Sequence, residues 1–206
     1  MNYETLLSFL IASMALTISP GPDIIYVLMQ GVVNGRKHGV VTALGLVSGI
    51  LIHTTLVAFG ISVLIKESTT AYFIIKLFGA GYLFYLAYKV YKSDVLLSLT
   101  KDKVLKRSLT GLFKQGFMMN VLNPKVTLFF LAFFPGFLFS NEVSTITQFY
   151  ILGGIFMLQA FIIFGLVAVM AGVISNYIKH HTQIGVVLKW TQVMVFIGIG
   201  IFILLP

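Results

Sequence analysis

The sequence has 206 residues, of which 58% are hydrophobic and 10% are charged, and its mean hydropathy is +1.00. A soluble core of this size cannot bury so much apolar surface, so the composition excludes an ordinary soluble protein and predicts a chain surrounded by lipid. The formal net charge of +8 does not indicate nucleic-acid binding, because the Lys and Arg residues lie between apolar runs and form no clustered basic face.

The apolar runs predict an all-α integral membrane protein with six transmembrane helices in a single domain, residues 1–206. A helix needs about 20 apolar residues to cross roughly 30 Å of hydrocarbon, and it must satisfy its own backbone hydrogen bonds. The predicted spans are 5–33, 39–65, 70–92, 111–139, 146–175 and 184–205. The N-terminus lacks the basic flank of a signal peptide, so we expect the first run to remain as a membrane helix.

The first span contains a motif that a regular helix cannot include, Ser19-Pro20-Gly21-Pro22-Asp23. Both prolines remove backbone donors and clash with the preceding turn, so we expect the helix to break there. Ser followed by Pro is also typical of a helix start, with Ser19 as N-cap and Pro20 at the first helical position. The alternative interpretation is a proline kink that serves only helix packing.

The second span carries His53 near its middle, on one face with Gly45 and Gly49 at four-residue spacing. Small residues at this spacing predict close packing against a neighbouring helix. His53 is then either a hydrogen-bonded packing residue or a proton relay or gate. After the third span, the basic segment 93–110 is predicted either to lie along anionic lipid head groups or to be a solvated linker.

The fourth span contains a second predicted break, at Asn123-Pro124. Asn123 is expected to be the N-cap of a new half-helix and Pro124 its first residue. Such a helix start, deep in the membrane, carries partial positive charge and free N–H groups that suit a carboxylate. Asn120, one turn before this break, and Gln159, midway through the fifth span, are further polar candidates for a substrate or ion site.

The two breaks stand 104 residues apart, and Phe59-Gly60-Ile61 is matched by Phe164-Gly165-Leu166 at an offset of 105. These matches predict a 3+3 repeat, with a first half over 1–92 and a second over 111–206. Because each half has an odd number of helices, the second must be inverted relative to the first, a layout of transporters whose sites lie near the membrane midplane. Chance recurrence in apolar sequence is the alternative.

Basic residues are concentrated in alternate connections between the spans. The first, third and fifth connections carry Arg36, Lys37, Lys92, Lys101, Lys103, Lys106, Arg107 and Lys179. The second has only Lys66 beside Glu67, and the fourth has Glu142 alone. The positive-inside rule therefore predicts that the odd-numbered connections are cytoplasmic and that both termini lie outside.

Asp23 and Lys125 are charged residues inside spans, and each follows a break. A charge in lipid costs several kcal/mol, so each must face water or a partner. One hypothesis is a plain ion pair that ties the first and fourth spans together. The other is that a substrate contests the pair, with Asp23 receiving an ammonium or a proton and Lys125 receiving a carboxylate, which fits a zwitterionic amino acid.

Together these motifs resemble the lysine exporter and homoserine/threonine resistance (LysE/RhtB) family of bacterial exporters. The likeness extends over nearly the whole chain and rests on the motif at 19–23, on Gly35-Arg36-Lys37-His38-Gly39, and on Asn120 with Leu122-Asn123-Pro124-Lys125. The resemblance implies efflux of amino acids or related compounds across the bacterial inner membrane, driven by the proton motive force, with both proline motifs near the transport path.

Signatures of enzymes are absent from the sequence: there is no nucleotide-binding glycine loop, no zinc-binding His-Glu-x-x-His motif, no serine elbow and no Cys. We therefore expect a secondary exporter without cofactor or metal, gated at Pro20, Gly21, Pro22 and Pro124. Its expected partners are an amino acid, protons and the lipid bilayer. The sequence does not decide whether the chain forms a homo-oligomer. The alternatives are a passive channel for a small solute and a non-transporting membrane scaffold or sensor.

Overall fold

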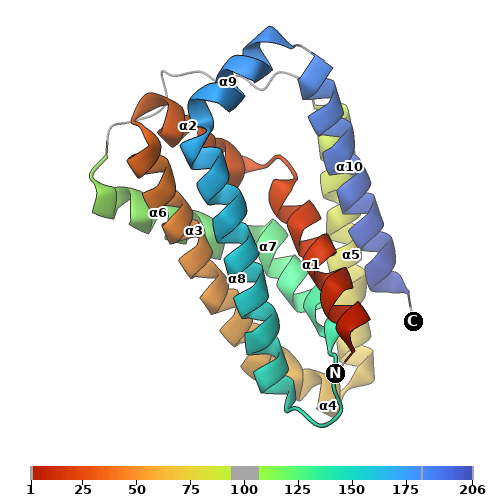
Figure 1. The fold of residues 1–206 in the computed structure, drawn as a ribbon. Coiled ribbons are helices and arrows are strands. Elements are labelled where there is room, and N and C mark those ends of the chain that lie inside the picture. The colour runs from red at the N-terminus through yellow and green to blue at the C-terminus, as the bar shows by residue number, and fades with distance from the viewer. Residues whose placement is uncertain (1, 94–106, 182, 206) are drawn as a thin grey trace.

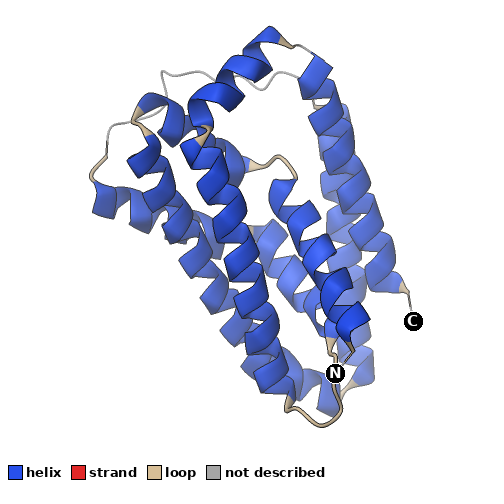
Figure 2. Cartoon of the chain, viewed as in Figure 1, coloured by secondary structure: helices blue, strands red, loops and turns tan. Residues whose placement is uncertain are grey.

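The computed structural model describes residues 2–93, 107–181 and 183–205. Throughout this part of the chain the regular structure is helical, and no strand is present (Figure 2). The helices are α1 (Tyr3–Ile18), α2 (Pro22–Val33), α3 (Arg36–Leu56), α4 (Ser62–Glu67), α5 (Thr69–Lys92), α6 (Leu109–Val121), α7 (Pro124–Leu128), α8 (Thr145–Val169), α9 (Ala171–His180) and α10 (Gln183–Leu204). The π-helical turn η1 (Val57–Ile61) joins α3 to α4, and the turns η3 (Phe129–Phe133) and η4 (Phe134–Phe137) extend α7.

Four continuous helical segments are long and apolar enough to cross a membrane, namely Arg36–Leu64, Thr69–Lys92, Thr145–Val169 and Gln183–Leu204. The remaining two predicted spans are bent pairs: α1 meets α2 at 59°, and α6 meets the segment Pro124–Phe137 at 47°. With each bent pair counted as one span, the described residues form the six spans that the sequence predicts. The breaks in the first and fourth spans are confirmed.

The fifth predicted span, 146–175, is too long. Helix α8 ends at Val169, and Met170 separates it from α9. Helix α9 buries Ala171 and Ser175 and leaves Val173 and Tyr177 exposed. The apolar run continues past the turn because this short helix still has one face to bury, so hydropathy alone does not reveal the break.

The bundle has two chemically different ends. One end, here called the basic end, holds α9 and the turn between α2 and α3, with Arg36 and Lys37, whereas both termini and α4 lie at the opposite end (Figure 1). The opposite end, called the terminal end, carries Glu4 and Glu142. This polarity matches the alternation of charge in the sequence, while the side of the membrane that each end faces stays a prediction. Residues 94–106 of the predicted connection 93–110 lie outside the described residues.

Phenylalanine side chains fill the half of the bundle between the α6–α7 break and the terminal end. This aromatic cluster consists of Phe9, Phe129, Phe130, Phe133, Phe134, Phe137 and Phe156, all of which are buried. The rings of Phe130 and Phe134 stack with centroids 4.3 Å apart, and Phe9 meets Phe134 edge-on at 5.2 Å. Because such large interdigitated side chains cannot part without changing rotamers, the cluster closes this half of the protein tightly.

Helix α3 packs on both α6 and α8, and its glycines permit close approach. A Cβ at Gly49 would lie 2.7 Å from Asn120 Oδ1, and one at Gly45 would overlap the carbonyl of Phe113. At distances this short, any side chain at these two positions would force its neighbour to shift. The predicted close-packed face of the second span is therefore confirmed, and α6 is its partner.

Candidate functional site

The first break is built differently from the sequence prediction. Helix α1 ends with Ser19 as its C-cap, and α2 begins at Pro22 with Gly21 as its N-cap. The prediction that Ser19 is an N-cap followed by Pro20 at the first helical position is therefore wrong. The reason is the second proline: the residue before a proline is driven out of the helical region, so Gly21 is extended and no helix can start before Pro22.

The second break follows the prediction. Asn123 is the N-cap of α7, its Oδ1 accepts a hydrogen bond from the backbone N–H of Lys125 at 3.0 Å, and Pro124 is the first helical residue. The other half of the same amide, Nδ2, donates to Asp23 Oδ2 at 2.8 Å. Asn123 thus joins the two breaks by one side chain.

A small cavity lies between the two breaks. Its polar lining consists of Thr17, Ser19, Asp23, Asn120, Asn123 and Lys125, and its apolar lining includes Leu16, Ile50, Phe156 and Phe164. The volume of about 30 Å³ would hold roughly two water molecules. The structure therefore brings together most of the residues singled out in the two motifs, including Gly21 and Pro22, in a space too small for an amino acid.

Asp23 and Lys125 share this cavity without a direct ion pair among the described residues. Lys125 Nζ donates to the carbonyl of Leu16 at 3.1 Å and lies 5.2 Å from the ring centroid of Phe196. The Leu16 carbonyl belongs to the last turn of α1, where carbonyls lack helical partners, so the ammonium caps that helix end. The plain ion-pair hypothesis does not describe this geometry, because Asp23 is held by Asn123 instead.

The same ammonium also stands next to the start of α2. A Cβ built on Gly21 would lie 3.7 Å from Lys125 Nζ, and no side chain caps the α2 N-terminus. A cation and an uncapped helix start, both facing one cavity, form an electropositive region. Chemically, the arrangement can hold a carboxylate at this side and an ammonium at Asp23.

His53 and Gln159 lie beside the cavity and do not line it. His53 Nε2 is 3.1 Å from the Asn120 carbonyl, so in the tautomer with Nε2–H the ring donates to it. Gln159 Nε2 donates to Thr17 Oγ1 at 2.9 Å. Both geometries match hydrogen-bonded packing roles that hold the cavity wall. Pro20 and Pro124 likewise sit outside the lining, and Pro20 borders a separate apolar cavity of about 170 Å³.

Several buried polar atoms in the described residues have no hydrogen-bond partner. They are Ser19 Oγ, Gln30 Nε2, His38 Nδ1, Asn120 Oδ1 and Gln159 Oε1. Ser19 and Asn120 line the cavity, and Gln159 supports its wall. Unpaired buried groups are uncommon in proteins, and three of these five atoms gather at the cavity or its wall.

Sequence reasoning missed Thr17 and Gln30. The signal for Thr17 was its four-residue spacing from Ser13 in an otherwise apolar run, which places both on one helix face. The signal for Gln30 was its position seven residues after Asp23, which is close to two helical turns and places both side chains on one helix face. Both are buried in the structure.

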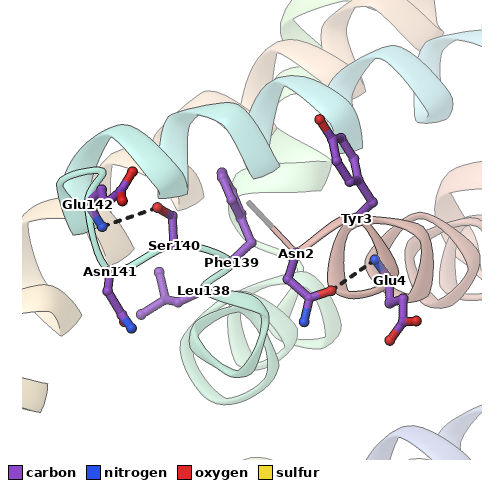
Figure 3. A pocket seen from close by; sticks show the side chains of 8 residues that line it. All are labelled: Asn2, Tyr3, Glu4, Leu138, Phe139, Ser140, Asn141 and Glu142. Carbon is purple, nitrogen blue, oxygen red and sulfur yellow. Dashed lines mark hydrogen bonds between the residues drawn. The ribbon is translucent and has the colours of Figure 1, made fainter.

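A larger hollow lies elsewhere, at the terminal end. Figure 3 shows it between the start of α1 and the 138–142 segment, with Glu4 and Glu142 among the residues that line it. Its volume is about 810 Å³. It is a wide surface depression, anchored by the bond from Asn2 N to the Phe139 carbonyl at 3.0 Å. None of the residues predicted for the site lines it.

Comparison with known proteins adds an independent line of argument. Residues 14–205 match the model of a family described as LysE type translocator. The chain is 29% identical over 183 residues to a homoserine/homoserine lactone efflux protein of Salmonella typhimurium, covering 89% of this chain and 88% of that protein. It is also 28% identical over 180 residues to an uncharacterized membrane protein of Vibrio cholerae, covering 87% and 86% of the two chains. No solved structure matches significantly.

Proposed function

Since this chain belongs to the LysE type translocator family, we propose that it is a secondary transporter that exports amino acids or related small zwitterions across the bacterial inner membrane. The printed name of the Salmonella relative, for efflux of homoserine and its lactone, favours this substrate class. Translocation is a transport function, so no catalytic residues are assigned.

The observation that carries the proposal is the cavity between the two helix breaks, where opposite charges face one space without pairing directly. A substrate carboxylate would replace the Leu16 carbonyl at Lys125 Nζ and lie near the start of α2, while the substrate ammonium would meet Asp23. In the absence of substrate, Asp23 would bind a proton, and export of the substrate would be driven by the exchange of this proton across the membrane.

Closure toward both ends supports alternating access over a permanently open pore. The aromatic cluster closes the half toward the terminal end. At the basic end, Gly31 of α2, Gly39 of α3 and Ala168 of α8 meet at backbone contact. A cavity of about 30 Å³ must enlarge before a solute can bind, and in transporters this occurs by movement of one half of the bundle against the other.

The topology completes the proposal. We place the basic end in the cytoplasm and both termini outside, following the positive-inside rule. The single domain then consists of inverted halves, 1–92 and 111–206, joined by 93–110. The matched positions of the two breaks, which face the same cavity, support this arrangement.

Counterflow of labelled homoserine and other amino acids in proteoliposomes tests the function. We expect saturable exchange in the native protein, and a decrease of about tenfold or more in Asp23→Asn and Lys125→Met, because the ammonium or the carboxylate of the substrate loses its charged partner. Lys76→Met is the matched control, since Lys76 Nζ also bonds a helix-end carbonyl, that of Leu205, at 3.2 Å but away from the cavity.

Other outcomes would identify the alternatives. Solute flux without exchange would indicate a channel. No flux of any amino acid from correctly folded protein, as judged by size-exclusion profile and thermal stability, would contradict transport and support a scaffold. Unchanged exchange in both cavity variants would place the substrate site elsewhere.

A further inference from the structure

A line of polar side chains runs along α2 from the central cavity to the basic end. Seven and eleven residues are close to two and three helical turns, so Asp23, Gln30 and Asn34 lie on nearly the same face, with Gln30 about 10 Å beyond Asp23 along the axis. Val27, between them on this face, is fully buried. The face therefore points into the protein and not into lipid.

Gln30 has half of its amide unpaired. Its side chain is 0% exposed, its Oε1 accepts from Asn34 Nδ2 at 2.8 Å, and its Nε2 has no acceptor among the residues that the structure describes. A buried N–H donor without an acceptor is destabilising, so this position is explained best by a second state in which an acceptor meets it. The missing partner is a hydrogen-bond acceptor such as a carboxylate.

Next to Gln30, α2 meets its neighbouring helices through small residues, and such contacts can separate. The neighbouring Gly31 contacts α3 and the α8–α9 junction, because a Cβ at Gly39 would lie 3.2 Å from Gly31 Cα, and one at Gly31 would lie 2.6 Å from Ala171 Cβ. The close contacts at Gly31 and Gly39 are made with alanine and glycine, in contrast to the aromatic cluster on the other side of the cavity. Parting these small-residue contacts requires a shift of the helices.

We propose that Gln30 is a second substrate-binding position, on the path between the basic end and the central cavity, where its Nε2 donates to the carboxylate of a solute on its way to Asp23 and Lys125. The proposal rests on the proposed transport function and adds a direction and a contact to it. Arg36 and Lys37, at the mouth of this path, attract the same anionic group.

The native chain has no Cys, so single cysteines can report the path directly. We expect Gln30→Cys in proteoliposomes to react with a charged, membrane-impermeant methanethiosulfonate reagent applied at the basic end and not at the terminal end. A saturating transported amino acid should slow this reaction severalfold. Val33→Cys is the control on the same helix, because Val33 is 37% exposed in the last turn of α2, so bound substrate should not slow its reaction.

Transport kinetics give a second measurement. We expect Gln30→Leu to raise the half-saturation concentration severalfold for substrate applied at the basic end. For substrate applied at the terminal end we expect little change. Gln30→Asn, which keeps the amide, should raise the half-saturation concentration less than Gln30→Leu does. An unreactive Gln30→Cys, labelling that substrate does not slow, or native kinetics in Gln30→Leu would each overturn the proposal. If these results come with loss of exchange in Asp23→Asn, the proposed function survives and only the role of Gln30 is lost.

Discussion

At the scale of single residues, Asn123 has the most connections in the site. Its carbonyl oxygen Oδ1 caps α7, and its Nδ2 holds the Asp23 carboxylate 100 positions earlier in the chain. A side chain that satisfies a helix start and a buried carboxylate together couples the geometry of both breaks. Any change in the position of Asp23 is therefore transmitted to the start of α7.

Replacement of Asn123 tests this coupling. We expect Asn123→Ala to lower the free energy of unfolding by about 1–3 kcal/mol, because a cap is lost and a carboxylate loses a donor, and to reduce exchange. Ser144→Ala is the control, since Ser144 caps α8 away from the cavity through Thr147 N at 3.2 Å. It should lower thermal stability in detergent without lowering exchange, and equal exchange in both variants would contradict the coupling.

At the scale of elements, close contact between α3 and α6 positions the end of α6, where Asn120 lines the cavity. Gly49 leaves room for the Asn120 side chain, and His53, one turn further along α3, lies against the Asn120 carbonyl. Two successive positions on one face of α3 thus fix the residue that precedes the second break. The packing face of the second span is part of the site for this reason.

A methyl group on this face should displace the cavity wall. In Gly49→Ala the new Cβ would lie 2.7 Å from Asn120 Oδ1, so we expect a loss of about 1–3 kcal/mol in stability together with weaker exchange. Gly154→Ala on α8 is the control, because a Cβ there meets nothing within 4 Å. Thermal unfolding in detergent and counterflow measure both effects, and matching behaviour of the two variants would show that the contact is unimportant.

At the scale of the whole molecule, the cavity is enclosed by two unlike closures. Interdigitated phenylalanines seal the terminal half, whereas small residues at backbone contact seal the basic end. The first closure consists of large aromatic rings packed against one another, and the second of glycine and alanine contacts between helices. Opening the terminal half should therefore cost the protein more stability than opening the basic end.

The aromatic cluster should behave as a structural closure. We expect Phe130→Ala to cost about 3–5 kcal/mol of stability, because a fully buried ring leaves a cavity, and to let solute leak in the absence of exchange. Phe78→Ala, at a position 73% exposed toward lipid, is the control and should change neither property. A stable, tightly sealed Phe130→Ala protein would show that the cluster does not close the path.

The sequence by itself determined the number of spans, the two breaks and the difference in charge between the ends. These features depend on local properties: apolar length sets a span, proline prevents helical hydrogen bonding, and charged residues stay out of lipid. The capping role of Asn123 was predictable for the same reason, since a cap is a contact within one turn.

Only the tertiary structure decided the partners of the charges. It showed that Lys125 caps α1 at Leu16, that Asn123 takes the place of a direct ion pair, and that the Nε2 donor of Gln30 is buried with no acceptor in the described part of the chain. Each of these depends on how closely glycine-containing helix faces approach one another, and no periodicity along a single segment encodes that distance.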